Sequence, residues 1–154
     1  MIEPLDHRRA GPLGLGAKAV FPTADEFVSG PGKGGRPLVI EATNSPFGFR
    51  DAVRASRIGG RVVLAGIPDG DAYTLSASDA RRRGLTIKFV RRMGDDYPRA
   101  IDLVTSGWVN VRALVTHRES LSAAPELFKA LAQNQTTYVK ALLYPNGKDG
   151  DRPN

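Results

Sequence analysis

The sequence predicts an α/β fold whose strands run parallel to one another. Three short aliphatic runs, at residues 38–40, 61–66 and 85–90, have the composition of strands. A segment with helical periodicity separates each run from the next. Two strands joined through a helix lie parallel, because a parallel pair needs a crossover connection. We therefore expect a parallel sheet with helices on its faces.

The first crossover helix is predicted over residues 46–58. Phe49, Ala52 and Val53 fall on one stripe of this helix, which we expect to face the sheet. The pair Gly59-Gly60 follows directly and is interpreted as the C-terminal stop of the helix.

A shorter helix is predicted before the third strand. Either Ser76 or Ser78 can cap its first turn, and Gly84 can end it. After the third strand, the apolar spacing of residues 97–107 predicts an amphipathic helix that ends at Gly107.

The alternation of strand and helix continues toward the C-terminus. We expect a strand at residues 113–116, a helix over 122–134 that opens at Ser122, and a last strand at 138–143. Residues 146–154 form a polar tail that is predicted to be disordered.

The beginning of the chain is irregular. Residues 1–3 have the pattern of a strand end, and the helical segment 6–10 runs into Gly11-Pro12, which we expect to stop it. The glycines of residues 11–16 follow the order G-x-x-G-x-G, whereas a nucleotide-binding turn has the order G-x-G-x-x-G and follows a strand. We interpret this segment as a disrupted helix and not as a phosphate-binding loop.

Composition narrows the classes of protein. The 154 residues are 41% apolar and 25% charged, as in a globular protein of one domain or slightly more. The net charge of +6 is not gathered in a recognised motif, so nucleic acid is not an expected partner. No apolar run approaches the roughly 20 residues of a membrane span, and no secretory signal is present, which predicts a cytoplasmic location. Without cysteine, and with His7 and His117 alone as imidazoles, a metal site is not expected.

Three blocks of sequence occur in the order and at the spacing of one enzyme family. They are VIEATNSPFGFRDAVRASRIGGRVVLAGIP, LTIKFVRRMGDDYPRAI and VNVRALVTHRESL. Through them the chain resembles the C-terminal half of the zinc-dependent medium-chain alcohol and polyol dehydrogenases, of the sorbitol dehydrogenase type, most strongly over residues 37–118. The resemblance implies an incomplete NAD-binding Rossmann domain at residues 1–110, starting at its second strand, and a strand–helix–strand of the catalytic domain at 111–145. The family's zinc ligands and glycine-rich turn have no counterpart here, so we expect a fragment.

The resemblance also implies which residues border the cofactor. Glu3 and Arg8 match an acidic residue that holds the adenosine ribose and an arginine near the adenine. A carboxylate there accepts hydrogen bonds from both ribose hydroxyls and repels the extra phosphate of NADP, so NAD is the expected cofactor. The other implied cofactor-binding residues are Ala42, Thr43, Ala65, Gly66, Ile67, Val90, Arg91 and Arg92. Glycine is expected at position 66 because a ligand would approach the backbone closely there.

The sequence departs from the family pattern at one of the positions that border the substrate. Arg92 and Met93 match positions beside the substrate, but sorbitol dehydrogenases commonly have a tyrosine where Met93 stands. The resemblance therefore implies a polyol or secondary alcohol and leaves the particular one open.

Two functions stay open at this point. The first is the cofactor-domain portion of an NAD-dependent, zinc-dependent oxidoreductase that acts on a CH–OH group, with no turnover by this chain alone. The second is a truncated, non-catalytic module that associates with another dehydrogenase subunit, or with a second copy, through exposed strands. His117 is interpreted as a structural histidine, and Ser45, Ser76 and Ser78 as turn and cap residues, since no triad spacing surrounds them.

Overall fold

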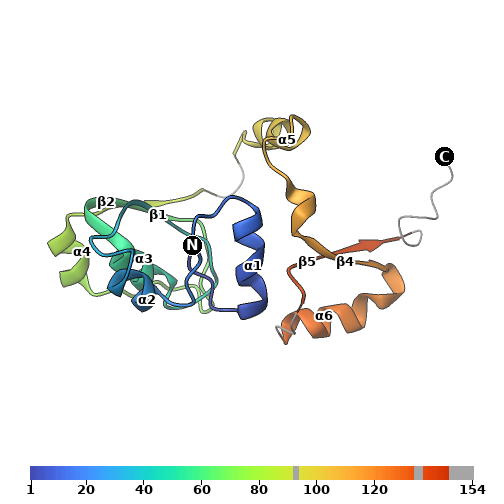
Figure 1. Cartoon of the computed structure of the whole chain (residues 1–154), viewed down its shortest axis with the longest axis horizontal. Coiled ribbons are helices and arrows are strands. Elements are labelled where there is room, and N and C mark those ends of the chain that lie inside the picture. Colours follow the sequence, from blue (N-terminus) through green and yellow to red (C-terminus); the bar gives the residue numbers. More distant parts are fainter. Residues whose placement is uncertain (92–93, 134–136, 146–154) are drawn as a thin grey trace. The chain divides into compact units, whose positions relative to one another are not determined.

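The chain folds into two compact units, each with its own parallel sheet. The computed structural model describes residues 1–91, 94–133 and 137–145, and it confirms the α/β prediction. Unit 1 comprises Met1, Leu5–Val20 and the chain from Asp96 onward, and unit 2 comprises Ile2–Pro4 and Phe21–Asp95. Figure 1 shows the elements of both units.

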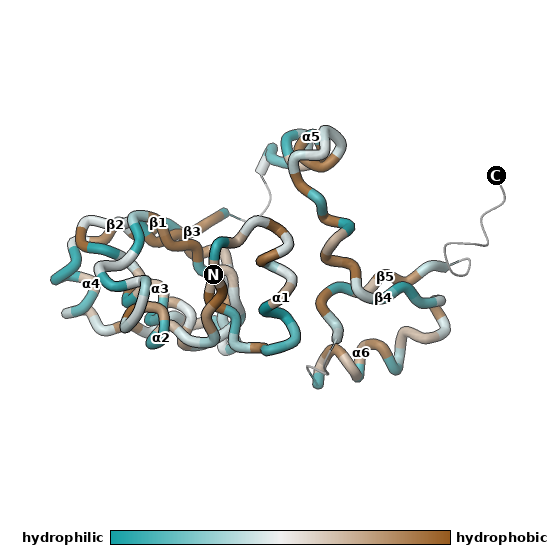
Figure 2. Tube along the Cα trace, in the orientation of Figure 1, coloured by the Kyte–Doolittle hydropathy of each residue, from teal (hydrophilic) through white to brown (hydrophobic). Residues whose placement is uncertain are grey.

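Unit 2 is built on three adjacent parallel strands. They are β1 (Arg36–Glu41), β2 (Ser56–Leu64) and β3 (Thr86–Phe89), with β2 in the centre. The register pairs Val39 with Val62, and Val62 with Ile87. Figure 2 shows apolar residues gathered along these strands. The predicted parallel arrangement of the three runs is thus confirmed.

The glycine pair before the second predicted strand lies inside β2. Gly59-Gly60 does not stop the helix, which ends earlier, at Ala55, so the sequence-based interpretation of this pair was wrong. Gly59 has a φ of +68°, and the pairing of β1 with β2 is irregular at this point. The positive φ of Gly59 belongs to a bulge in β2. Glycine adopts a positive φ in a bulge as readily as at the end of a helix, so its presence does not distinguish the two.

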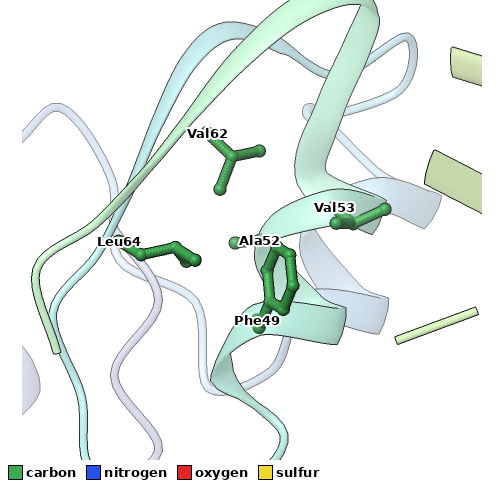
Figure 3. Close-up of a cluster of buried hydrophobic side chains, with 5 residues drawn as sticks. All are labelled: Phe49, Ala52, Val53, Val62 and Leu64. Atoms are coloured by element: carbon green, nitrogen blue, oxygen red, sulfur yellow. The ribbon is translucent and has the colours of Figure 1, made fainter. Parts of the chain in front are cut away.

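The core of unit 2 lies between α3 (Gly48–Ala55) and β2. Phe49, Ala52 and Val53 of α3 point toward Val62 and Leu64 of β2, and all five are buried (Figure 3). The stripe that the helical spacing predicted therefore faces the sheet, as expected. Because β2 is anchored by this core, the residues that follow it are held in place.

Two capped helices complete unit 2. In α4 (Ala77–Arg83) the side chain of Ser76 accepts a hydrogen bond from the backbone N–H of Asp79 at 3.4 Å, and Gly84 ends the helix in the left-handed conformation. Of the two serines left open, the structure thus selects Ser76. The helix α2 (Ala24–Ser29) was not predicted, although Thr23 and Glu26 have the spacing of a capping box, and Thr23 Oγ1 accepts from the Glu26 N–H at 3.1 Å.

The first helix continues through the residues that were expected to stop it. α1 spans Asp6–Gly14 and contains Pro12, so the predicted stop at Gly11-Pro12 was wrong. Proline removes one backbone donor, but the last turn closes beyond it, because the N–H groups of Leu15 and Gly16 donate to Pro12 and Leu13 at 3.1 and 3.2 Å. The predicted strand end at residues 1–3 survives as one parallel bridge between Ile2 and Phe21.

The rest of unit 1 follows the predicted alternation with shifted boundaries. Its elements are α5 (Tyr97–Thr105), a 3₁₀ turn η1 (Val111–Leu114), β4 (Val115–Ser120), a 3₁₀ turn η2 (Leu121–Ala123), α6 (Ala124–Ala132) and β5 (Lys140–Tyr144), and β4 pairs with β5 in parallel. The strand predicted at 113–116 begins only at Val115, because the Asn110 side chain accepts from the Ala113 N–H at 3.2 Å and starts a 3₁₀ turn instead. Ser122 does not cap α6, since its hydroxyl lies 2.8 Å from that of Ser120. The predicted tail at 146–154 lies outside the described residues.

Candidate functional site

Most of the predicted cofactor-binding residues follow the three strands of unit 2, at the end of the sheet where the strands finish. Ala42 and Thr43 come after β1, Ala65 to Ile67 after β2, and Val90 after β3. Parallel strands end on the same side, and the N–H of Val90 donates to the Leu64 carbonyl at 2.9 Å. We call this set, residues 42–43, 65–67 and 90–91, the carboxyl edge. Open α/β sheets bind ligands at such an edge.

Apolar side chains are uncovered along the carboxyl edge. Ile67 is 61% exposed and Val90 is 50% exposed, and Ala42 and Ala65 are exposed as well. An exposed aliphatic surface suits a flat ligand that has an apolar face. The residues present therefore fit the nicotinamide half of a dinucleotide.

A buried carboxylate lies directly beneath this edge. Glu41, the last residue of β1, is only 5% exposed, and its Oε1 accepts from the Thr43 N–H at 2.7 Å and from the Thr43 hydroxyl at 2.5 Å. Its Oε2 is buried without a hydrogen-bond partner. The sequence-based prediction did not include Glu41. The pattern that indicates it is an acidic residue at the end of an otherwise aliphatic strand, since acidic side chains are rarely buried.

Gly66 is a glycine because of the protein's own backbone. A Cβ atom at this position would lie 2.0 Å from the Thr43 carbonyl oxygen and 2.7 Å from Glu41 Oε2. No side chain fits there, since real Cβ atoms do not come this close to other atoms. The ligand approach that was expected to require glycine is thus not needed to explain it.

Tyr73 joins the loop after β2 to the core. Its hydroxyl donates to the Gly66 carbonyl, and its ring packs edge-on against Phe49 with centroids 5.5 Å apart. Burial of the hydroxyl raises the pKa of Tyr73, and the negative charges of Glu41 and Asp71 raise it further. The phenol is therefore held as a neutral donor to the edge.

The remaining predicted residues lie elsewhere. Glu3 is half-buried in unit 2, where its N–H donates to the Phe21 carbonyl at 2.9 Å, whereas Arg8 is in α1 of unit 1 and donates to the Tyr138 carbonyl at 3.5 Å. Arg91 is exposed at the end of the carboxyl edge. The predicted substrate residues Arg92 and Met93 lie outside the described residues.

Within the described ranges, no group of three or more histidine, aspartate or glutamate side chains is placed to hold a metal ion. His117 stacks on Tyr138 with ring centroids 3.8 Å apart, and its Nδ1 lies 3.0 Å from Thr116 Oγ1. The described residues therefore offer no ligand set for the zinc of the full-length family enzymes.

Among the described residues, cavities also lie away from the carboxyl edge. One of about 330 Å³ lies in unit 1 and is lined by residues that include Glu119, Leu127 and Tyr138. The other, of about 190 Å³, is lined by Leu38, Gly60 and neighbouring residues at the opposite ends of the strands. Neither includes a residue of the carboxyl edge.

Among the residues described, no helix is long and apolar enough to cross a membrane.

The fold and the carboxyl edge define a Rossmann-type α/β protein, and comparisons with known proteins specify the family. No family model matches the chain. The chain is 26% identical over 112 residues to the sorbitol dehydrogenase of Bacillus subtilis, a match that covers 73% of this chain and 32% of that protein. It is 37% identical over 92 residues to the sorbitol dehydrogenase of Homo sapiens, which covers 60% of this chain and 26% of that protein.

Solved structures agree with these relatives. The 2R,3R-butanediol dehydrogenase of Bacillus subtilis matches with a TM-score of 0.76 and 26% identity, over 94% of this chain and 43% of that one. A zinc-binding dehydrogenase of Sinorhizobium meliloti, bound to NADP, matches with a TM-score of 0.78 and 27% identity, over 94% of this chain and 44% of that one. The chain is thus similar to the medium-chain alcohol and polyol dehydrogenases, which supports the resemblance predicted from its sequence. It spans about a third of the length of the curated relatives it matches.

Proposed function

We propose that this chain is the cofactor-binding portion of an oxidoreductase that acts on the CH–OH group of a polyol or secondary alcohol. The observation that carries this proposal is the carboxyl edge, where the ends of three parallel strands present backbone groups beside exposed Ile67 and Val90. Solved neighbours of the same fold were crystallised with NADH or NADP, which supports a dinucleotide at this edge. A nicotinamide cofactor held there would supply the hydride acceptor for oxidation of a CH–OH group.

The chain's own residues bind and orient in this proposal. Residues of the carboxyl edge would hold the nicotinamide half, and Arg92 and Met93 would form one wall of the substrate pocket. Glu3 would accept from the ribose hydroxyls, so NAD is favoured over NADP. The resemblance assigns Arg8 to the adenine. Residues 1–110 would form the cofactor domain and 111–145 a part of the catalytic domain.

The metal of this family would be held by other residues than those described. Because the described side chains do not form a ligand set, we propose that the chain alone does not turn over its substrate. Polarisation of the substrate oxygen would then depend on a catalytic portion outside the segment described here.

A titration separates binding from turnover. The full chain is titrated with NADH and with NADPH, and nicotinamide fluorescence reports binding. We expect saturable binding that is tighter for NADH, and no oxidation of a panel of polyols in the presence of NAD and zinc. Turnover in this panel would show that the chain is catalytically sufficient, and an absence of binding to both nucleotides would remove the proposal.

A second candidate function is a non-catalytic module that pairs with a dehydrogenase subunit or with a second copy. The open edges of the sheet favour it, since β1 and β3 each pair only with β2 among the described strands. Sedimentation of the chain alone, and of the chain mixed with an intact sorbitol dehydrogenase, tests this. This function is excluded if the chain sediments as a monomer by itself and does not sediment together with the dehydrogenase in the mixture. A cytoplasmic location is part of either proposal.

A further inference from the structure

Glu41 is a buried carboxylate that the proposed function does not yet use. We propose that Glu41 is a positioning residue: it fixes the loop after β1 against the loop after β2, so that the carboxyl edge presents backbone atoms to the nicotinamide half of a dinucleotide. This inference rests on the proposed function for the identity of the ligand. The local arrangement that it describes can be tested without any ligand.

Thr43 directs its polar groups inward, toward this carboxylate. Its N–H and its hydroxyl both donate to Glu41 Oε1, at 2.7 and 2.5 Å, and the hydroxyl also accepts from the Ser45 N–H at 3.2 Å. The hydroxyl proton is thus already committed. Thr43 is a predicted cofactor-binding residue. Because its hydroxyl is engaged, it would contact a ligand through its backbone and not through its hydroxyl.

Glu41 also holds the loop after β2, through its backbone carbonyl. The backbone carbonyl of Glu41 accepts from the N–H groups of Ala65 and Gly66, at 2.7 and 3.1 Å. Farther along the two loops, the Asp69 N–H donates to the Asn44 carbonyl at 2.8 Å, and the Asn44 amide lies 3.3 Å from the Asp69 carboxylate. The loops after β1 and β2 are thus joined at two places, and Glu41 makes the inner junction.

Room for the carboxylate is made by two glycines. A Cβ on Gly48 would lie 2.5 Å from Glu41 Oε1, and one on Gly66 would lie 2.7 Å from Oε2. Oε2 itself has no hydrogen-bond partner. A buried and unpartnered oxygen is unfavourable for folding, and an apolar side chain of similar volume would serve stability at least as well. The carboxylate is better explained by the geometry it imposes on Thr43 than by a contribution to stability.

The experiment compares five versions of the full chain by NADH titration: wild type, Glu41→Gln, Thr43→Val, Thr43→Ser and the double variant E41Q/T43V. Hydrogen bonds to charged groups are strong enough that we expect the first two substitutions each to weaken NADH binding roughly tenfold. Thr43→Ser keeps the hydroxyl and should remain within about twofold of wild type. The double variant should be no weaker than either single variant, because one shared interaction is lost. Thr74→Val, an exposed site in the same unit, is the matched control.

Amide hydrogen exchange without ligand supplies the second measurement. In the wild type the Thr43 N–H should be protected, and Glu41→Gln should raise its exchange rate, because a neutral amide oxygen is a weaker acceptor than a carboxylate. The Gly66 N–H, which donates to the backbone carbonyl of Glu41, and the core strand β2 should keep their protection. If NADH does not bind the wild type, the proposed function fails, and exchange alone then decides whether Glu41 positions the loops. The inference is overturned if E41Q leaves Thr43 protected, if protection is lost throughout unit 2, or if the two single effects on affinity multiply in the double variant.

Discussion

A Cβ atom on Gly66 would lie 2.0 Å from the carbonyl oxygen of Thr43. The two residues follow different strands, so this contact sets how closely the loops after β1 and β2 approach each other. We expect Gly66→Ala to lower the free energy of unfolding by about 1–3 kcal/mol, because the backbone must move apart to admit the methyl group. Denaturant unfolding followed by circular dichroism measures the change.

The control for this prediction is Gly11→Ala. Gly11 lies inside α1, and a Cβ there would meet nothing within 4 Å. Alanine is the better helix former, so this variant should be as stable as the wild type or up to about 1 kcal/mol more stable. Equal stability of the two variants would contradict the close contact at Gly66.

Leu64 should be among the most sensitive positions of unit 2. Its side chain is 2% exposed and packs in the cluster that joins α3 to β2, immediately before the carboxyl edge. We expect Leu64→Ala to lower the free energy of unfolding by about 2–5 kcal/mol, through lost burial and the cavity left behind. Leu38→Ala on β1, where the side chain is 52% exposed, should have a clearly smaller effect in the same denaturant titration.

The two serines before α4 should differ although they are two residues apart. Ser76 caps the helix and Ser78 lies within it, with the two hydroxyl oxygens 2.9 Å apart. Ser76→Ala should destabilise unit 2 by about 1 kcal/mol, since the Asp79 N–H loses its acceptor. Ser78→Ala should change stability less. Thermal unfolding of both variants measures the difference. If Ser78→Ala had the lower melting temperature, the assignment of Ser76 as the cap would be wrong.

Tyr73 predicts how stability depends on alkaline pH. Its pKa is raised in the folded state, mainly by burial and then by Glu41 and Asp71. The neutral phenol therefore favours folding: its contribution is fully present below the unfolded pKa of about 10 and is lost as the pH rises through the higher folded pKa. Tyr73→Phe should be about 1 kcal/mol less stable than the wild type near neutral pH, and should lose less stability above about pH 10.

Tyr97→Phe is the matched control for this pH dependence. Tyr97 is 60% exposed, so the same substitution there removes a phenol hydroxyl from a ring that is largely uncovered. Chemical unfolding at a series of alkaline pH values measures all three proteins. Parallel curves for the wild type and Y73F would show that the Tyr73 hydroxyl does not titrate differently in the folded state.

Local signals predicted the regular elements well and the glycine positions poorly. The apolar stripe of α3 and the aliphatic runs of β1, β2 and β3 have a periodicity that one kind of element satisfies, and each was confirmed. Gly59-Gly60 and Gly11-Pro12 were misassigned, because conformational freedom at glycine allows a bulge as readily as a helix stop, and because a proline can be accommodated near a helix end.

The sequence by itself predicted the fold class, the family resemblance and a candidate site after the ends of parallel strands, because the apolar runs and the helical spacing between them are local properties of the chain. The tertiary structure alone decided that Glu41 is buried, that Thr43 turns its hydroxyl inward and that Gly66 is glycine because of Thr43. These properties arise between loops that are distant in sequence and meet only when the sheet has formed. Their physical cause is the exclusion of a side chain and the desolvation of a carboxylate, neither of which a local pattern records.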